Sequence, residues 1–223
     1  MLDGTQVVVK IHTDDDTESL QEPEALCFWN GRGAVRLINW DPASRAMLIE
    51  RCVPGTPLGT SYDEASIEIA AAILRRLWRR PSGEVEWRTL ADEAERWLRE
   101  LPERYAPSRV LAEALDALRA LAPTQEDVVL CHQDLHGGNI LSAEREPWLA
   151  IDAKPIVAEP AYDAVALIRD ARATRSQLRR RLDLFTECLG VDRERVRLWG
   201  IVKCLAWDRP AEAALFSEVG SRR

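Results

Sequence analysis

A cluster of chain-breaking residues divides this chain of 223 residues into two parts of different character. The cluster covers residues 54–60 and reads PGTPLGT, a density of proline and glycine that is typical of a break between structural units. Short runs of apolar and β-branched residues precede it, whereas long stretches rich in Ala, Leu, Arg and Glu follow it. We therefore expect an α+β fold with two lobes, a small β-rich lobe over residues 1–53 and a larger, mainly helical lobe over residues 54–223.

The residue pattern also predicts the elements within each lobe. In the small lobe, β-branched and apolar runs predict strands at 7–11, 34–38 and 46–50. One longer stretch predicts a helix at 17–29. In the larger lobe, apolar residues recur every three or four positions in three stretches, which predicts amphipathic helices over 63–80, 86–104 and 108–121. A strand at 128–131 and a hairpin of 139–141 with 148–152 are expected before further helices from about residue 161.

One window between these short strands carries an unusual density of reactive side chains. It runs from Cys131 to Leu141 as CHQDLHGGNIL, and WLAID follows at residues 148–152. The spacing H-x-D-x-x-x-x-N matches the catalytic loop of protein kinases, in which the Asp orients the acceptor hydroxyl and the Asn binds a metal ion. This spacing makes Asp134 the candidate catalytic base and Asn139 a candidate Mg²⁺ ligand. Asp152, on the other arm of the predicted hairpin, is the second candidate ligand, because Mg²⁺ prefers hard oxygen donors.

The same window carries a more specific resemblance. HQDLHGGNIL, followed by IDAKPIVAEPAYD at residues 151–163, resembles the aminoglycoside and hydroxyurea antibiotic resistance kinases, and most closely the streptomycin 6-phosphotransferases. The resemblance implies a protein-kinase-like fold and an ATP- and Mg²⁺-dependent transfer of phosphate to a hydroxyl of an aminoglycoside, with streptomycin as the expected acceptor. It implies the same roles for Asp134, Asn139 and Asp152, and it makes Asp163 a structural carboxylate that supports the catalytic loop.

The resemblance extends to the nucleotide-binding residues of the small lobe. Residues 7–10 read VVVK and resemble the strand that carries the phosphate-binding lysine of this fold, so Lys10 is expected to contact the phosphates of ATP. Its acidic partner is expected on the following helix, with Glu22 favoured over Glu24. The segment from Glu50 to Cys52 resembles the hinge whose backbone groups bind adenine.

The beginning of the chain departs from the family pattern. Asp3-Gly4 is a signal for a hairpin turn, yet only two residues precede it. This fold begins with a strand, a glycine-rich loop over the phosphates and a second strand. At about five to six residues per strand, these elements need more residues than precede residue 7. We therefore expect an N-terminally truncated small lobe without its nucleotide lid.

Composition limits the remaining function classes. The formal net charge of −7 disfavours nucleic acid and anionic membrane surfaces as partners and favours a cationic small molecule such as an aminoglycoside. No apolar run reaches the roughly 20 residues that a membrane-spanning helix needs. The five cysteines are odd in number and widely spaced, which indicates reduced thiols and a cytoplasmic protein.

Three other interpretations stay open. A kinase of the same fold could act on another small alcohol, and a truncated remnant could bind ligand without catalysing a reaction. A metal-dependent hydrolase built on His132 and His136 is disfavoured, because zinc sites usually have three or more protein ligands and the only other histidine, His12, lies in the small lobe.

Overall fold

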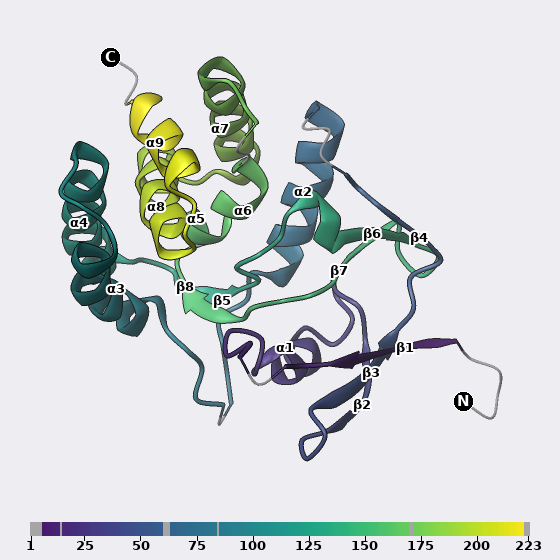
Figure 1. The fold of residues 1–223 in the computed structure, drawn as a ribbon. Helices are drawn as coiled ribbons and strands as arrows, with labels where there is room; N and C mark the ends of the chain where they lie inside the picture. The colour runs from purple at the N-terminus through teal and green to yellow at the C-terminus, as the bar shows by residue number, and fades with distance from the viewer. Residues whose placement is uncertain (1–5, 14, 60–62, 84, 170–171, 221–223) are drawn as a thin grey trace. The chain divides into compact units, whose positions relative to one another are not determined.

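A computed structural model describes residues 6–13, 15–59, 63–83, 85–169 and 172–220 of the chain (Figure 1). The chain divides into two compact units, of which the first combines Met1–Trp87 with Leu130–Pro155 and the second combines Arg88–Val129 with Ile156–Arg223. The boundary expected at residue 54 falls inside the first unit, so the two-lobe division stays a prediction. The turn expected at Asp3-Gly4 lies outside the described residues.

The first unit contains a three-stranded antiparallel sheet with the order β1-β3-β2. Its strands are β1 (Val7–Ile11), β2 (Leu37–Asp41) and β3 (Ala46–Glu50). Strand β2 begins three residues later than expected, because the preceding residues pair elsewhere and Val35 donates its N–H to the carbonyl of Ala150 at 3.0 Å. Among the described residues β1 pairs with β3 alone, and the exposure of its Val9 (60%) and Ile11 (66%) is that of an edge strand.

Helix α1 (Glu22–Trp29) follows β1 in this unit. It begins five residues later than expected, at the point where Pro23 occupies the first turn and its missing N–H costs no helical hydrogen bond. It ends where Asn30 and Gly31 adopt left-handed backbone angles, with φ of 47° and 75°. The buried indole of Trp29 donates to the carbonyl of Leu77 at 3.0 Å and so ties α1 to helix α2 (Glu64–Leu77).

A second antiparallel sheet in the first unit has the order β4-β6-β7. It consists of β4 (Pro54–Pro57), β6 (Ile140–Ala143) and β7 (Trp148–Ala150), and β6 with β7 forms the expected hairpin. Strand β4 lies inside the chain-breaking cluster, where prolines are tolerated because β4 is at the edge of its sheet. The short strand β5 (Val129–Cys131) leads into the polar window between residues 131 and 141.

The second unit is mainly helical (Figure 1). Its elements are α3 (Leu90–Arg104), α4 (Arg109–Leu121), the 3-10 helix η1 (Ala122–Thr124), β8 (Ile156–Ala158), α5 (Pro160–Asp163), α6 (Val165–Ile168), α7 (Arg175–Leu189), α8 (Arg193–Ala206) and α9 (Pro210–Glu218). Helix α8 is largely buried and packs against α4, α5, α7 and α9. Gly200 permits the contact with α9, since a Cβ atom there would lie 2.5 Å from the ring of Phe216. No helix within the described ranges is long and apolar enough to cross a membrane.

Candidate active site

The predicted catalytic loop folds back on itself in a tight turn. The N–H of His136 donates to the carbonyl of Asp134 at 2.9 Å, and the N–H of Asn139 donates to the carbonyl of His136 at 2.8 Å. The imidazole Nδ1 of His136 accepts from the N–H of Gly138 at 3.1 Å and caps the 3-10 helix η2 (Gly137–Asn139). These local hydrogen bonds hold Asp134, which is only 8% exposed, in a fixed position at the start of the turn.

Gly137 allows this loop to pass directly beside the segment that follows β4. The N–H of Gly59 donates to the carbonyl of Gly137 at 3.1 Å, and the N–H of Leu58 donates to the carbonyl of Ile140 at 2.8 Å. A Cβ atom at position 137 would lie 1.8 Å from the carbonyl oxygen of Gly59. The close approach of the two backbones therefore requires glycine at this position.

Asn139 links the loop to the segment that carries Asp152. Its Nδ2 donates to the backbone carbonyl of Asp134 at 3.0 Å, and its own carbonyl accepts from the N–H of Ile151 at 3.0 Å. With Nδ2 committed to Asp134, the amide oxygen Oδ1 faces the other way and makes no hydrogen bond within the described residues. Asn139 thus offers an amide oxygen that can bind a metal ion next to the predicted base.

His132 supports the same region through hydrogen bonds to its backbone. Its Nε2 donates to the carbonyl of Ile151 at 3.0 Å, and its carbonyl accepts from the N–H of Lys154 at 3.0 Å. Its ring stacks on the indole of Trp29, with centroids 6.1 Å apart and planes 11° apart. In the part of the chain that the structure describes, no group of three or more His, Cys, Asp or Glu side chains is arranged to bind a metal ion. The hydrogen bonds and the ring stacking of His132 fit a supporting role for this residue.

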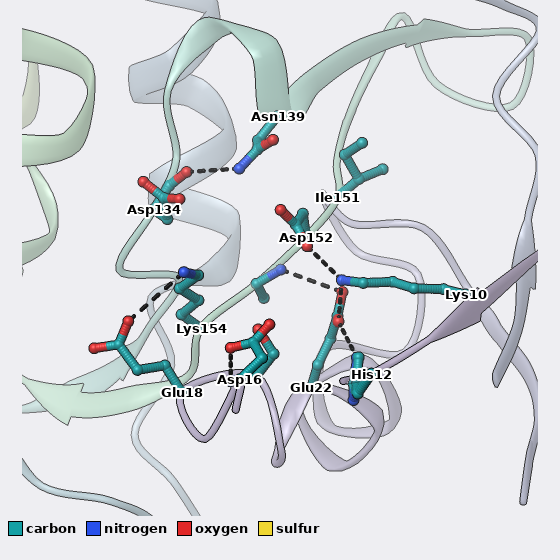
Figure 2. A network of polar contacts seen from close by, with 12 residues as sticks. Lys10, His12, Asp16, Glu18, Glu22, Asp134, Asn139, Ile151, Asp152 and Lys154 are labelled. Carbon is teal, nitrogen blue, oxygen red and sulfur yellow. Dashed lines mark hydrogen bonds and ion pairs between the residues drawn. The ribbon is translucent and has the colours of Figure 1, made fainter. Parts of the chain in front are cut away.

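Lys10, Glu22 and Asp152 form one polar network (Figure 2). The ammonium group of Lys10 contacts Oε2 of Glu22 and Oδ1 of Asp152. The Glu22 side chain is completely buried, whereas 43% of the Asp152 side chain is exposed. Glu24, the other glutamate considered on this helix, makes no polar contact with Lys10 among the described residues.

The pKa values in this network follow from the ion pairs. Burial alone would lower the pKa of Lys10, but the negative charges of Glu22 and Asp152 outweigh it and raise that pKa above its ordinary value. Burial would likewise raise the pKa of Asp152, but its hydrogen bond and charge attraction to Lys10 lower it below the ordinary value. Both groups are therefore charged at neutral pH.

The backbone also helps to position Asp152. Its φ of 60° lies in the left-handed region, which aspartate tolerates better than most residues. The next N–H, that of Ala153, donates to Oε1 of Glu22 at 3.3 Å. Glu22 therefore holds both Lys10 and the main chain beside Asp152.

The residues expected at the hinge lie apart from this network. Neither Glu50 nor Cys52 contacts Lys10, Glu22 or Asp152 in the described ranges. The N–H of Glu50 donates to the carbonyl of Arg36 at 2.9 Å, so this backbone group is already engaged. Cys52 is buried, and its burial raises the pKa of the thiol.

Arg145 was not singled out in the sequence, yet it holds the end of β3. Its Nε and Nη2 bind the two carboxylate oxygens of Glu50 at 2.7 and 2.8 Å, and its guanidinium also donates to the carbonyls of Gly31 and Ala34. Burial would raise the pKa of Glu50, but the Arg145 contact lowers it overall. Nothing in the loop sequence Glu144-Arg145-Glu146 marks this arginine, because apart from the adjacent Glu146 its partners lie 95 or more positions away.

The donor set fits a magnesium ion. Asn139 supplies Oδ1, and Asp152 supplies Oδ2, which makes no hydrogen bond among the described residues. Figure 2 shows Asp152 with one carboxylate oxygen facing Lys10 and the other facing away from it. An amide oxygen and a carboxylate oxygen are ligands that Mg²⁺ accepts, and the remaining positions are commonly filled by phosphate oxygens and water.

Asp163 lies in α5 of the second unit and is buried, with 1% of its surface exposed. Its assignment as a support for the catalytic loop stays a prediction.

Comparison with known proteins identifies relatives of this sequence. The family model described as aminoglycoside/hydroxyurea antibiotic resistance kinase matches residues 1–217. The chain is 39% identical over 209 residues to the hydroxyurea phosphotransferase of Kitasatospora aureofaciens, covering 88% of this chain and 59% of that protein. It is 37% identical over 223 residues to the streptomycin 6-kinase of Streptomyces glaucescens, covering 92% of this chain and 72% of that kinase. The chain therefore spans about three fifths of the first relative and somewhat more of the second.

Solved structures confirm the expected fold class. The choline kinase LicA from Streptococcus pneumoniae is similar over 99% of this chain and 80% of its own, with a TM-score of 0.67 and 17% sequence identity. A crystal structure of LicA in complex with AMP is also similar, with a TM-score of 0.65, 17% identity and coverage of 96% and 77%. The chain has the α+β, protein-kinase-like fold of these kinases.

Proposed function

Since the chain belongs to the aminoglycoside/hydroxyurea antibiotic resistance kinase family, we propose that it transfers the γ-phosphoryl group of ATP to a hydroxyl group of an aminoglycoside, with streptomycin as the expected acceptor. The observation that carries this proposal is the network in which Lys10 contacts both Glu22 and Asp152 in the same unit as the loop of Asp134 and Asn139. A lysine, two acidic groups, an amide and a candidate base are the side chains that phosphoryl transfer requires.

In the proposed reaction, Asp134 orients the acceptor hydroxyl and takes its proton as the hydroxyl oxygen attacks the γ-phosphorus. The bond between the γ-phosphorus and the bridging oxygen of ATP breaks, and ADP keeps that electron pair. Asp134 is suited to this step because its loop is held rigidly by the hydrogen bonds of His136 and Asn139.

The remaining residues bind and orient the nucleotide. Asn139 and Asp152 would hold Mg²⁺, which when bound neutralises charge that develops on the phosphates. Lys10 would contact the phosphates while Glu22 keeps it in place. Backbone groups of the Glu50 to Cys52 segment other than the N–H of Glu50 would bind adenine, and the AMP complex of LicA supports nucleotide binding by this fold.

The charge of the chain supports a cationic acceptor. The net charge of −7 favours association with aminoglycosides, which carry several positive charges.

All five cysteines are free thiols, which supports the expected cytoplasmic location.

A coupled assay of ADP release tests the proposal, with ³¹P NMR to identify a phosphate ester. The acceptors are streptomycin, hydroxyurea and choline, each with and without Mg²⁺. We expect Mg²⁺-dependent turnover with streptomycin. Hydroxyurea is the second candidate, because the hydroxyurea phosphotransferase shares 39% identity with this chain, and turnover with choline alone would indicate another small-alcohol kinase.

Thermal unfolding with Mg-ATP separates an enzyme with another acceptor from a remnant. A ligand that binds only the folded state, present at a concentration of 100 times its Kd, stabilises that state by about 2.7 kcal/mol. If no acceptor is phosphorylated and saturating Mg-ATP leaves Tm unchanged, the proposed function is wrong.

A further inference from the structure

The buried carboxylate of Glu22 has a hydrogen-bond partner that the proposed reaction does not use. Nε2 of His12 lies 2.9 Å from Oε2 of Glu22, the same oxygen that contacts Lys10 (Figure 2). Oε1 of Glu22 accepts from the N–H of Ala153 at 3.3 Å. The His12 side chain is only 1% exposed, and it reaches Glu22 together with Lys10 because residues two apart on an extended chain point to the same side.

The surroundings of His12 assign its hydrogen-bonding role. Glu22 is paired with Lys10 as a carboxylate and can only accept, so Nε2 of His12 must carry the proton that they share. Nδ1 of His12 is buried and has no hydrogen-bond partner among the described residues, so a proton there would be a buried, unsatisfied donor. The contacts therefore place the shared proton on Nε2. The indole of Trp40, with ring centroids 5.9 Å away, packs on the imidazole and restricts its movement.

We propose that His12 is a positioning residue that holds the Glu22 carboxylate while Lys10 changes partners. This inference rests on the proposed function, in which Lys10 leaves Asp152 to contact the phosphates. During that exchange Glu22 keeps one N–H donor on each oxygen, His12 on Oε2 and Ala153 on Oε1. Glu22 is therefore held on both oxygens throughout the exchange, and Lys10 keeps a fixed acidic partner while it turns from Asp152 to the phosphates.

Two substitutions of similar size isolate this hydrogen bond. His12→Gln keeps an N–H donor in reach of Glu22, whereas His12→Leu fills the space without a donor. We expect His12→Leu to lower kcat/KM for ATP about tenfold, the effect of losing one hydrogen bond to a charged group. We expect His12→Gln to stay within about threefold of the wild type, and KM for the acceptor to change by less than about twofold in both variants. Equal losses in the two variants would show that His12 only fills space.

Nitrogen NMR of ¹⁵N-histidine-labelled protein tests the contact without any turnover. The chain has three histidines, and His12→Gln identifies the signal of His12 by its disappearance. We expect Nε2 of His12 to be protonated at pH 8, and Glu22→Gln to shift its signal. A bare Nε2 with a protonated Nδ1 would overturn the proposal, even if His12→Leu fails to fold. If the wild type neither turns over nor binds Mg-ATP, the proposed function fails, and the tautomer still decides whether His12 donates to Glu22.

Discussion

The ammonium group of Lys10 contacts the carboxylate of Asp152, although 142 positions separate the two residues in the chain. The contact joins the predicted phosphate-binding lysine to a predicted Mg²⁺ ligand. The pKa values of both residues shift in the direction that keeps them charged. Under the proposed function, Lys10 exchanges this contact for the phosphates of ATP while Asp152 binds Mg²⁺, so we expect the two residues to act together.

Asp152→Asn tests this coupling. We expect Mg²⁺-dependent kcat to fall by at least about 100-fold, because a charged metal ligand is lost. The fold should be kept, since asparagine also tolerates the left-handed φ of 60° at this position. Kinetics across a Mg²⁺ titration measure the effect. Asp127→Asn is the matched control, because Asp127 is exposed and has a φ of 48°, and equal losses in the two variants would contradict the metal role.

The ion pair also predicts how stability depends on pH. The pKa of Asp152 is lowered from 3.8, so its stabilising contribution is present above about pH 3.8 and is lost as the pH falls through the lower, folded-state value. The pKa of Lys10 is raised from 10.5, so its contribution is present below about pH 10.5 and is lost as the pH rises through the higher value. Urea unfolding of the wild type and Asp152→Asn should differ by a constant amount from about pH 5 to 8 and converge in acid. A difference that grows in acid would refute the ion pair.

Asp134→Asn tests the catalytic base. We expect kcat to fall by about 10² to 10⁴, because the acceptor hydroxyl loses the group that takes its proton. KM for ATP should change by less than about threefold, since Asp134 does not contact the nucleotide in the proposed arrangement. Steady-state kinetics with thermal unfolding as a check on folding measure this. Asp116→Asn, at an exposed position on α4, is expected to behave as the wild type, and full activity of Asp134→Asn would exclude its proposed role.

Gly137→Ala tests the close approach of the catalytic loop to Gly59. The added Cβ would lie 1.8 Å from a backbone carbonyl oxygen, so the loop must move, and we expect a destabilisation of about 3 kcal/mol or more together with a loss of activity. Denaturant unfolding measures the first effect. At the neighbouring Gly138, a Cβ meets only the His136 side chain, at 2.9 Å, which can rotate away. Gly138→Ala should therefore be milder, and the opposite order would show that the contact with Gly59 does not constrain the loop.

Arg145→Lys tests the clamp at the end of β3. Lysine cannot bind both oxygens of Glu50 and the carbonyls of Gly31 and Ala34 at once, so we expect a loss of about 1 to 3 kcal/mol in the free energy of unfolding. Urea unfolding of the variant measures this loss. Arg119→Lys, which affects a solvent-exposed pair with Asp116, should change stability by less than about 0.5 kcal/mol. Similar values for the two variants would mean that the Arg145 contacts contribute little.

Local patterns predicted most of the elements and placed the polar window between short strands. Asp134 and Asn139 are five positions apart in one turn, so their spacing reports their geometry directly, and the VVVK run marks the strand of Lys10 in the same way. Element ends were less predictable where a partner elsewhere decides them. Val35 leaves the expected strand because it bonds to Ala150, a residue 115 positions away.

Residues that are neighbours in the chain were enough to predict the α+β class, the loop that carries Asp134 and Asn139, and the family. The resemblance already pointed to Glu22 as the partner of Lys10. The contact of Lys10 with Asp152, the hydrogen bond of His12 to Glu22 and the contact of Arg145 with Glu50 emerged from the folded structure. These contacts join segments that are far apart in the chain, and their existence depends on which surfaces pack together and which buried charges need a partner. No local spacing encodes that requirement.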